Sequence, residues 1–228
     1  MSTPVDTAYL TYPQSDGNPM ADNTKQFRWI VTIQGGLDGL FRDRPDIFVA
    51  GDLLWYPVEG HPEICTAPDT MVVFGRPKGD RGSYLQWEEG DVAPQVVFEI
   101  LSPGNTIAAM TRKFRFYERH GVEEYYLYDP DTGELSGWQR QGETLEEIAS
   151  MSGWISPRLG VRFELEHDIL RLYHPDGNPF ATYVELMQQR EEERQRAEQE
   201  HQRAEQERQR ADRLAARLRE LGIDPDAE

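Results

Sequence analysis

The chain has 228 residues, of which 38% are apolar and 11% aromatic, and a formal net charge of −17. This length suffices for one domain of ordinary size with a core, plus an appendage. No run approaches the roughly 20 apolar residues that cross a membrane. The first residues lack the basic start and apolar stretch of a signal peptide, so we expect a cytoplasmic protein without a membrane partner.

The charge and the motifs argue against several classes of function. The first 184 residues hold 15 basic and 28 acidic side chains, so they carry −13, which repels phosphate backbones. The single cysteine, Cys65, excludes an internal disulfide framework and a multi-cysteine zinc site. GxGxxG, Walker, GxSxG and HExxH patterns are absent from the sequence, which argues against nucleotide-binding, hydride-transfer and zinc enzymes.

The first elements in chain order are an arm and a helix. Residues 1–22 are rich in Pro, Asp, Ser and Thr and indicate an irregular arm. Asn23 or Thr24 can then cap a helix, in which apolar residues recur at helical spacing up to Phe41. Two glycines at 35 and 36 weaken this prediction, because each costs about 1 kcal/mol relative to alanine.

Three strands are predicted next, over Ile47–Tyr56, Thr70–Phe74 and Gln95–Leu101. The third reads QVVFEIL and is apolar on both faces, which is typical of a central strand covered on each side. An SPGN loop leads into a predicted helix over 106–120, which Gly121 ends.

A strand over Glu124–Asp129 follows and is closed by the turn DPDTG. Shorter β segments are predicted over Leu135–Gln139, Thr144–Ala149, Val161–Leu165 and Ile169–Tyr173. We therefore expect a mixed α/β domain over 23–182.

The sequence changes character near Tyr183, and a charged helix is predicted over 183–222 with a tail at 223–228. QRAEQEH, QRAEQER and QRADRLA form a seven-residue repeat. One heptad position holds Ala197, Ala204, Ala211 and Leu218, and the position three further on holds Glu200, Glu207, Leu214 and Leu221. Only the last turns have an apolar seam, so a coiled coil and a solvated helix both remain open.

Glu99 is the most informative polar residue, because it stands inside the strand that we expect to be buried. An unpaired carboxylate there would cost several kcal/mol or stay protonated. A divalent cation could compensate it, and so could a structural salt bridge.

Asp69 and Lys113 could complete a site with Glu99. Asp69 follows Pro68 directly ahead of a strand, which alone is a common turn, but two carboxylates on neighbouring strands can share one hard cation. Lys113, one of only three lysines, borders the arc of Ile107, Met110, Phe114 and Tyr117 that should face the sheet. It could stabilise negative charge near a metal-bound water or place its ammonium in solvent. Arg112, Arg115 and Arg119 cluster on the far side, where they could contact phosphates or form a solvated face.

Three motifs resemble a known family. APDTMVVFG, VVFEILSPGN and K(x)₃Y(x)₃GVEEYYLYDP, in this order, are similar to the Uma-two family of bacterial endonucleases, within the PD-(D/E)XK nuclease superfamily. The resemblance covers about residues 24–184. It implies a restriction-endonuclease-like fold with an αβββαβ core, to which the β segments and the long C-terminal helix are added.

The resemblance also implies roles for single residues. Asp69 and Glu99 would bind the metal, and the carbonyl of Ile100 could add a third oxygen. The superfamily lysine would stand at Leu101 and is matched instead by Lys113 on the next helix, a departure shared with the family. The acid expected four residues before that lysine is Ala109 here. A glutamate of an N-terminal Tyr-Glu motif is not found, and Asp52 is the nearest substitute.

These features lead to two hypotheses. The first is a Mg²⁺-dependent endonuclease, with Mn²⁺ as a substitute, that hydrolyses phosphodiester bonds of DNA by analogy with the superfamily. The tyrosines at 117, 125 and 126 are interpreted as packing the helix onto the sheet. The second is a catalytically silent interaction module with a nuclease fold, which forms a homo-oligomer or recruits a partner protein through its C-terminal helix.

Overall fold

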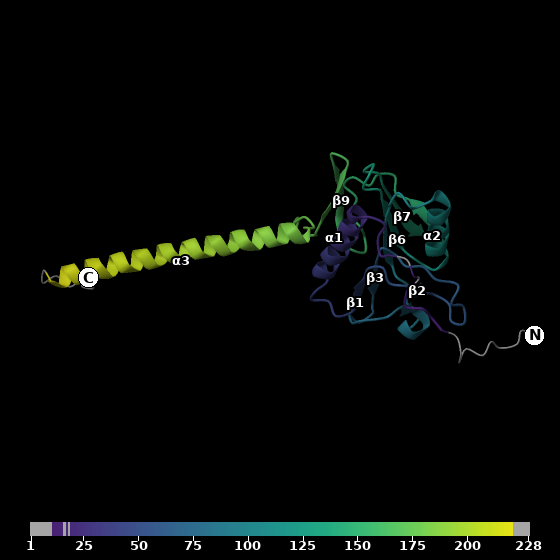
Figure 1. The fold of residues 1–228 in the computed structure, drawn as a ribbon, viewed down its shortest axis with the longest axis horizontal. Helices are drawn as coiled ribbons and strands as arrows, with labels where there is room; N and C mark the ends of the chain where they lie inside the picture. Colours follow the sequence, from purple (N-terminus) through teal and green to yellow (C-terminus); the bar gives the residue numbers. More distant parts are fainter. Residues whose placement is uncertain (1–10, 16, 18, 221–228) are drawn as a thin grey trace, which may run out of the picture. The chain divides into compact units, whose positions relative to one another are not determined.

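The computed structural model describes residues 11–15, 17 and 19–220 and divides the chain into two compact units, with the boundary in the sequence between Phe180 and Ala181 (Figure 1). The first unit contains the sheets and two helices, α1 and α2. The second contains one helix, α3.

A six-stranded sheet forms the centre of the first unit. Its strands, in spatial order, are β1 (Ile47–Ala50), β3 (Thr70–Phe74), β5 (Val96–Ile100), β6 (Glu124–Tyr128), β7 (Leu135–Gln141) and β8 (Thr144–Glu147). The β5–β6 pair is parallel and the other neighbours are antiparallel. With α1 (Thr24–Leu40) and α2 (Ile107–Arg119), the chain order α1, β1, β3, β5, α2, β6 confirms the predicted αβββαβ core and the mixed α/β class.

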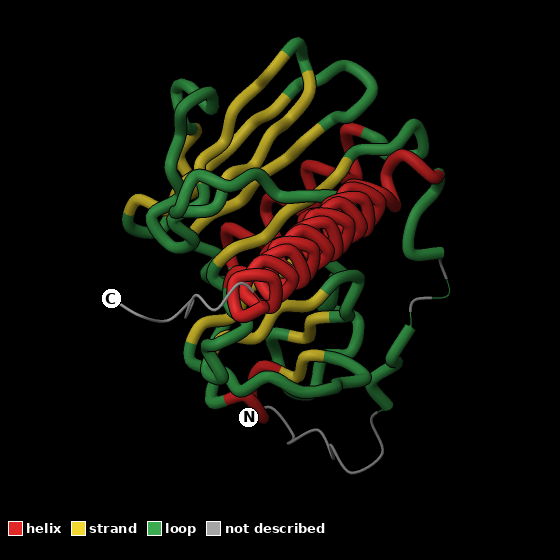
Figure 2. The backbone as a smooth tube through the Cα atoms, turned by 90° about the vertical axis from the view of Figure 1, so that its left-hand side faces the viewer, coloured by secondary structure: helices red, strands yellow, loops and turns green. Residues whose placement is uncertain are grey.

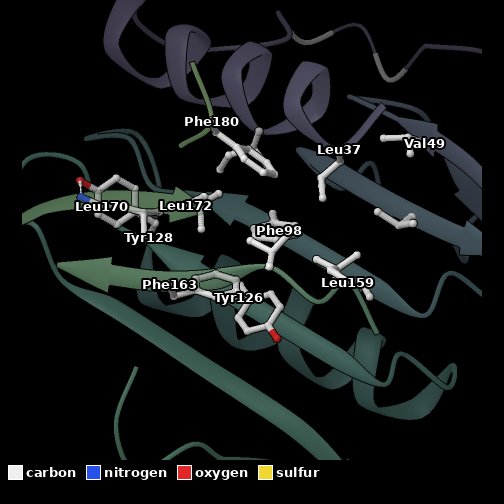
Figure 3. Packing of buried hydrophobic residues seen from close by; sticks show 14 of the residues in the cluster. Leu37, Val49, Phe98, Tyr126, Tyr128, Leu159, Phe163, Leu170, Leu172 and Phe180 are labelled. Atoms are coloured by element: carbon white, nitrogen blue, oxygen red, sulfur yellow. Dashed lines mark hydrogen bonds between the residues drawn. The ribbon is translucent and has the colours of Figure 1, made fainter. Parts of the chain in front are cut away.

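Both faces of this sheet are covered. The buried stripe of α1, with Ile30, Ile33 and Leu37, packs on one face together with the hairpin of β9 (Arg162–Glu166) and β10 (Ile169–Tyr173), and Figure 3 shows part of this core. Aromatic residues of α2 pack on the other face. All five residues of β5 are buried, as expected for a central strand.

The two glycines inside α1 do not end the helix, and Gly36 has a packing role. A Cβ atom at Gly36 would lie 2.2 Å from the ring of Phe180. Glycine at this position therefore lets the end of the first unit pack directly on the helix backbone. Asn23 caps α1 as predicted, since its side chain accepts hydrogen bonds from the amides of Lys25 and Gln26, both at 2.9 Å.

The predicted strand over Ile47–Tyr56 is wrong, because the chain turns after Ala50. Asp52 has a φ of 47°, in the left-handed region, and its amide donates to the carbonyl of Pro68 at 3.1 Å. The rest of the segment forms β2 (Trp55–Tyr56), which pairs in parallel with β4 (Tyr84–Leu85) in a separate two-stranded sheet, ahead of the 3₁₀ turn η2 (Gln86–Glu89).

The predicted position of Ile107 is also wrong. It was expected to face the sheet with Met110, Phe114 and Tyr117, yet its side chain is 90% exposed. Ile107 is the first residue of α2, directly after the N-cap Thr106, and the covered part of the helix begins only later. The apolar residues of α2 therefore begin about one turn before the part of the helix that packs on the sheet.

The second unit confirms the long C-terminal helix, α3 (Tyr183–Glu220) (Figure 2). Thr182 and Glu185 form a capping box: the Glu185 carboxylate accepts from the amide of Thr182 at 2.7 Å, and the Glu185 amide donates to the Thr182 hydroxyl at 3.3 Å. Ala197, Ala204 and Ala211 are exposed. Leu221, the side chain of Leu218 and the predicted tail at 223–228 lie outside the description. Of the helices described, none combines the length and the apolar character that crossing a membrane requires.

Candidate active site

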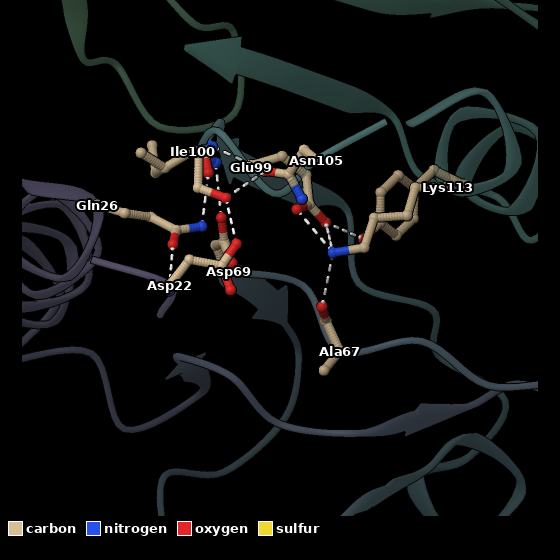
Figure 4. Close-up of polar contacts among 10 residues, drawn as sticks. Asp22, Gln26, Ala67, Asp69, Glu99, Ile100, Asn105 and Lys113 are labelled. Carbon is tan, nitrogen blue, oxygen red and sulfur yellow. Dashed lines mark hydrogen bonds and ion pairs between the residues drawn. The ribbon is translucent and has the colours of Figure 1, made fainter. Parts of the chain in front are cut away.

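Three elements bring the predicted site residues together at one end of the sheet (Figure 4). Asp69 directly precedes β3, and Glu99 stands near the end of the antiparallel neighbour β5, where Thr70 pairs with Phe98. The side chain of Lys113 reaches the same place from α2. Asp69 is 8% exposed and Glu99 is 3% exposed, so both acids are buried.

Lys113 and Glu99 form a close ion pair. The Lys113 Nζ atom lies 2.8 Å from Oε1 and 2.7 Å from Oε2 of Glu99, and it also donates to the carbonyl of Ala67 at 3.1 Å. Tyr117 donates its hydroxyl to the same carboxylate. Burial lowers the pKa of the ammonium, but the charges of Glu99 and Asp69 outweigh this and raise the pKa of Lys113. The amine therefore stays cationic at neutral pH.

Asp69 has less compensation for its charge. Its Oδ2 atom accepts a hydrogen bond from the amide of Ile100 at 2.6 Å. Burial, and then the charge of Glu99, raise the pKa of Asp69 to about 8, against the opposing effects of Lys113 and the Ile100 amide. The site thus holds one more buried acid than its ammonium can neutralise.

The backbone of Ile100 is held at both its amide and its carbonyl. While its amide donates to Asp69, its carbonyl accepts from Nε2 of Gln26 at 2.8 Å. Gln26 Oε1 in turn accepts from the amide of Asp22 at 2.8 Å, and the Asp22 carboxylate accepts from the hydroxyl of Ser102. The carbonyl that was expected to offer a third oxygen therefore lies at the site with a fixed orientation and one lone pair in use.

Gln26 was not singled out from the sequence, although a signal was present. It stands on the stripe that contains Ile30, Ile33 and Leu37, four and three residues apart, and it is buried with them. A polar residue on an otherwise apolar stripe requires a buried hydrogen-bond partner, which here is the Ile100 carbonyl.

Asp52 lies near the other acids. It follows β1 at the turn, and its charge contributes to raising the pKa values of both Asp69 and Lys113. It is therefore part of the electrostatic surroundings of the site, although it stands in a turn and not on a strand.

Tyr117 and Tyr125 pack α2 onto the sheet as predicted, whereas the prediction is wrong for Tyr126, which lies in the core under α1. Tyr117 packs α2 onto the sheet but also donates to Glu99, and burial followed by the Glu99 charge raises its pKa well above the ordinary value. Tyr125 is 1% exposed and packs against Tyr117 with ring centroids 5.2 Å apart. Its hydroxyl is buried without a hydrogen-bond partner, and burial, with the charges of Glu99 and Asp69, raises its pKa.

The site offers oxygen donors of the kind that a hard divalent cation binds, although Lys113 is paired with Glu99. Mg²⁺ prefers oxygen ligands and keeps several waters. Asp69, Glu99 and the Ile100 carbonyl offer such oxygens, although no cluster of three or more Asp, Glu, His or Cys side chains suited to a metal occurs within the described part of the chain. The poorly compensated Asp69 and the unpartnered hydroxyl of Tyr125 are both groups that a cation with its waters would satisfy.

Comparison with known proteins places the chain in a family. The family model Uma2, described as "Putative restriction endonuclease", matches residues 21–177. The chain belongs to the Uma2 family. One structure similar to this Uma2 chain is described as "a putative nuclease belonging to DUF820" from Anabaena variabilis, with 18% identity and a TM-score of 0.45 over 61% of this chain and 74% of the other. None of the curated proteins that were searched matches the chain.

Proposed function

We propose that this Uma2 protein is a Mg²⁺-dependent endonuclease that hydrolyses phosphodiester bonds of DNA at Asp69, Glu99 and Lys113. The observation that carries the proposal is the convergence of the three side chains. Lys113 Nζ lies within 2.8 Å of both Glu99 oxygens, and the Asp69 carboxylate accepts a hydrogen bond from the amide of Ile100, the residue that follows Glu99 in β5. The family match supports the reaction class, and DNA as substrate rests on analogy within the family.

Asp69, Glu99 and the carbonyl of Ile100 would hold the cation. When bound, Mg²⁺ (or Mn²⁺) polarises the scissile phosphate and lowers the pKa of a coordinated water. Gln26 keeps the Ile100 carbonyl directed at the site, because the side-chain amide of Gln26 donates a hydrogen bond to that oxygen. Asp52, with its charge close to Asp69, is a weaker candidate ligand.

Lys113 would act on the phosphate. Its ammonium stays charged because its pKa is raised, so it can stabilise the negative charge that develops on the phosphoryl oxygens and orient the attacking water. Tyr117 positions the Glu99 carboxylate, since its hydroxyl binds the same Oε1 atom as the lysine.

Cleavage of plasmid and single-stranded DNA with Mg²⁺ or Mn²⁺ tests this proposal. The wild type should cut, whereas Glu99→Ala and Lys113→Ala should each lose most of the activity. Arg171→Gln, which changes an exposed residue of the β9–β10 hairpin, serves as the control and should cut like the wild type. Activity that survives both site substitutions undiminished would contradict the assignment.

A second candidate is an interaction module that assembles through α3. This candidate is favoured by the Lys113–Glu99 ion pair, because it already uses the Glu99 carboxylate that a metal would need, and by the exposed alanines that recur every seven residues in α3. Light scattering of the full chain should then give a multiple of 26.3 kDa, and Ala197→Glu, Ala204→Glu and Ala211→Glu together should return the monomer. A wild-type monomer at all concentrations would remove the homo-oligomer. The cytoplasmic location expected from the sequence stays a prediction.

A further inference from the structure

The outer face of α2 carries three arginines that the chemistry of the site does not use. Arg112, Arg115 and Arg119 are all exposed, while Phe114 and Tyr117 face the core. At 3.6 residues per turn the three arginines fall within an arc of about 60° and span about 10 Å along the helix axis. They therefore form one short positive stripe, which we call the α2 arginine face.

Most other basic side chains of the first unit are engaged. Within the described residues up to Phe180, all three lysines form ion pairs with carboxylates. Seven arginines do the same: Arg42, Arg44, Arg76, Arg81, Arg158, Arg162 and Arg171. Arg140 donates to backbone carbonyls.

The α2 arginine face differs from this pattern. Among the described residues of the unit, only its three members and Arg28 on α1 have a guanidinium without a hydrogen-bonded or ion-paired partner. In a unit with a net charge of −13, carboxylates are plentiful, and three neighbouring unpaired arginines on one helix face are therefore unusual.

Acids of α2 itself do not neutralise the face. Glu118 is the only acid within α2, and its Oε1 atom accepts from the amide of Leu145 at 3.0 Å. Lys113 directs its ammonium to Glu99, on the sheet side of the helix. The outer face of α2 thus carries three arginines with no ion pair among the described residues, on a unit that is acidic as a whole.

We propose that the α2 arginine face binds the sugar-phosphate backbone of the DNA strand that is cut at Asp69, Glu99 and Lys113. One strand of DNA carries a negative charge about every 3.4 Å along the axis, so a span of about 10 Å matches roughly three phosphates. Arg112 is the sequence neighbour of Lys113, so the face and the lysine of the site belong to the same helix. This inference rests on the proposed function and gives an acidic nuclease a local means of holding a polyanion.

The test is DNA binding as a function of salt, measured by fluorescence anisotropy on the full chain with EDTA, so that no cleavage occurs. The variant is Arg112→Gln, Arg115→Gln and Arg119→Gln together. The matched control is Arg28→Gln, Arg42→Gln and Arg171→Gln, which removes three exposed arginines of the same unit and changes the net charge equally. Thermal unfolding of both variants confirms that each is folded.

The α2 variant should lower the slope of log K against log[salt] by about 2.7 for duplex DNA and about 2.1 for single strands, and the control by far less. Equal slopes in the two variants would overturn the proposal, because bulk charge would then explain the effect. A wild type that cleaves DNA while the α2 variant binds and cleaves unchanged would overturn this inference alone. A wild type that neither binds nor cleaves would overturn the proposed function as well.

Discussion

Two buried glutamates stand on the neighbouring parallel strands β5 and β6, and each accepts a hydrogen bond from a tyrosine hydroxyl, but only Glu99 is paired with an ammonium. Glu99 is 3% exposed and Glu124 is 1% exposed. Glu99 meets an ammonium and a hydroxyl on the α2 face of the sheet. Glu124 lies on the opposite face, beside Tyr126, which belongs to the core under α1.

Glu124 is held by neutral donors. Its carboxylate accepts from the hydroxyl of Tyr126 at 2.9 Å, from the amide of Arg158 at 2.8 Å and from the hydroxyl of Ser156. Burial raises its pKa in spite of these hydrogen bonds. These contacts fasten the segment around Ser156 to β6, so Glu124 has a structural role.

The comparison teaches that burial of an acid does not by itself indicate chemistry, whereas the partners do. Glu99 is paired with a cation and lies beside Asp69, whose pKa is raised to about 8, and beside the unpartnered hydroxyl of Tyr125. An arrangement that only stabilised the fold would have no need of a second, poorly compensated acid.

The largest expected effect concerns activity. Glu99→Gln should lower DNA cleavage in Mg²⁺ by about a thousandfold, because it removes a charged oxygen ligand and the partner of Lys113. Glu124→Gln should leave the activity of the folded protein within a few fold. Equal losses in the two variants, measured by plasmid nicking at matched folded concentration, would erase the distinction between the two acids.

The next effect concerns stability. Glu124→Leu should lower the free energy of unfolding by about 3 kcal/mol or more, because two hydroxyls and the amide of Arg158 lose their acceptor in the core. Urea unfolding followed by circular dichroism measures this loss. A loss under about 1 kcal/mol would show that Glu124 does not fasten this segment.

The pH dependence of stability follows from Asp69. Its pKa in the folded protein is about 8, above its ordinary value of 3.8, so the folded state binds more protons between these values. The stability of the metal-free wild type should therefore fall as the pH rises from about 4 to 8, by at least about 2 kcal/mol relative to Asp69→Asn. Parallel pH profiles of the two proteins, from urea unfolding in EDTA, would contradict the shift.

The smallest effect distinguishes two adjacent tyrosines. Tyr125→Phe removes a hydroxyl without a partner, so the stability of the metal-free protein should stay the same or rise slightly, while the increase in Tm on adding Mg²⁺ should shrink. Tyr126→Phe removes a hydroxyl bonded to Glu124 and Trp154 and should cost about 1 kcal/mol in metal-free protein. Thermal melts with and without Mg²⁺ give both quantities, and an unchanged Mg²⁺ effect in Tyr125→Phe would exclude the hydroxyl from the site.

Much of the fold could be predicted because its signals are local. The apolar run QVVFEIL, the cap of the first helix and the Gly121 stop all act within a few residues, and the elements lie where these signals placed them. The segment Ile47–Tyr56 was misread because the turn at Asp52 depends on a hydrogen bond to Pro68, which is distant in sequence.

The candidate site was predictable only in part for the same reason. Asp69, Glu99 and Lys113 could be selected as residue types at suggestive positions, and the structure brings them together. The hold of Gln26 on Ile100, and the missing partner of Tyr125, depend on how α1 and α2 pack on the sheet. No local pattern specifies such contacts.

The most direct measurement of the central claim is the position of a divalent cation in crystals soaked with Mn²⁺. The account predicts an anomalous peak between the carboxylates of Asp69 and Glu99, about 2.0–2.6 Å from an oxygen of each, and no peak there in crystals of Asp69→Asn. Wild-type crystals in which Lys113 and Glu99 stay paired and this place holds no peak at saturating Mn²⁺ would contradict it.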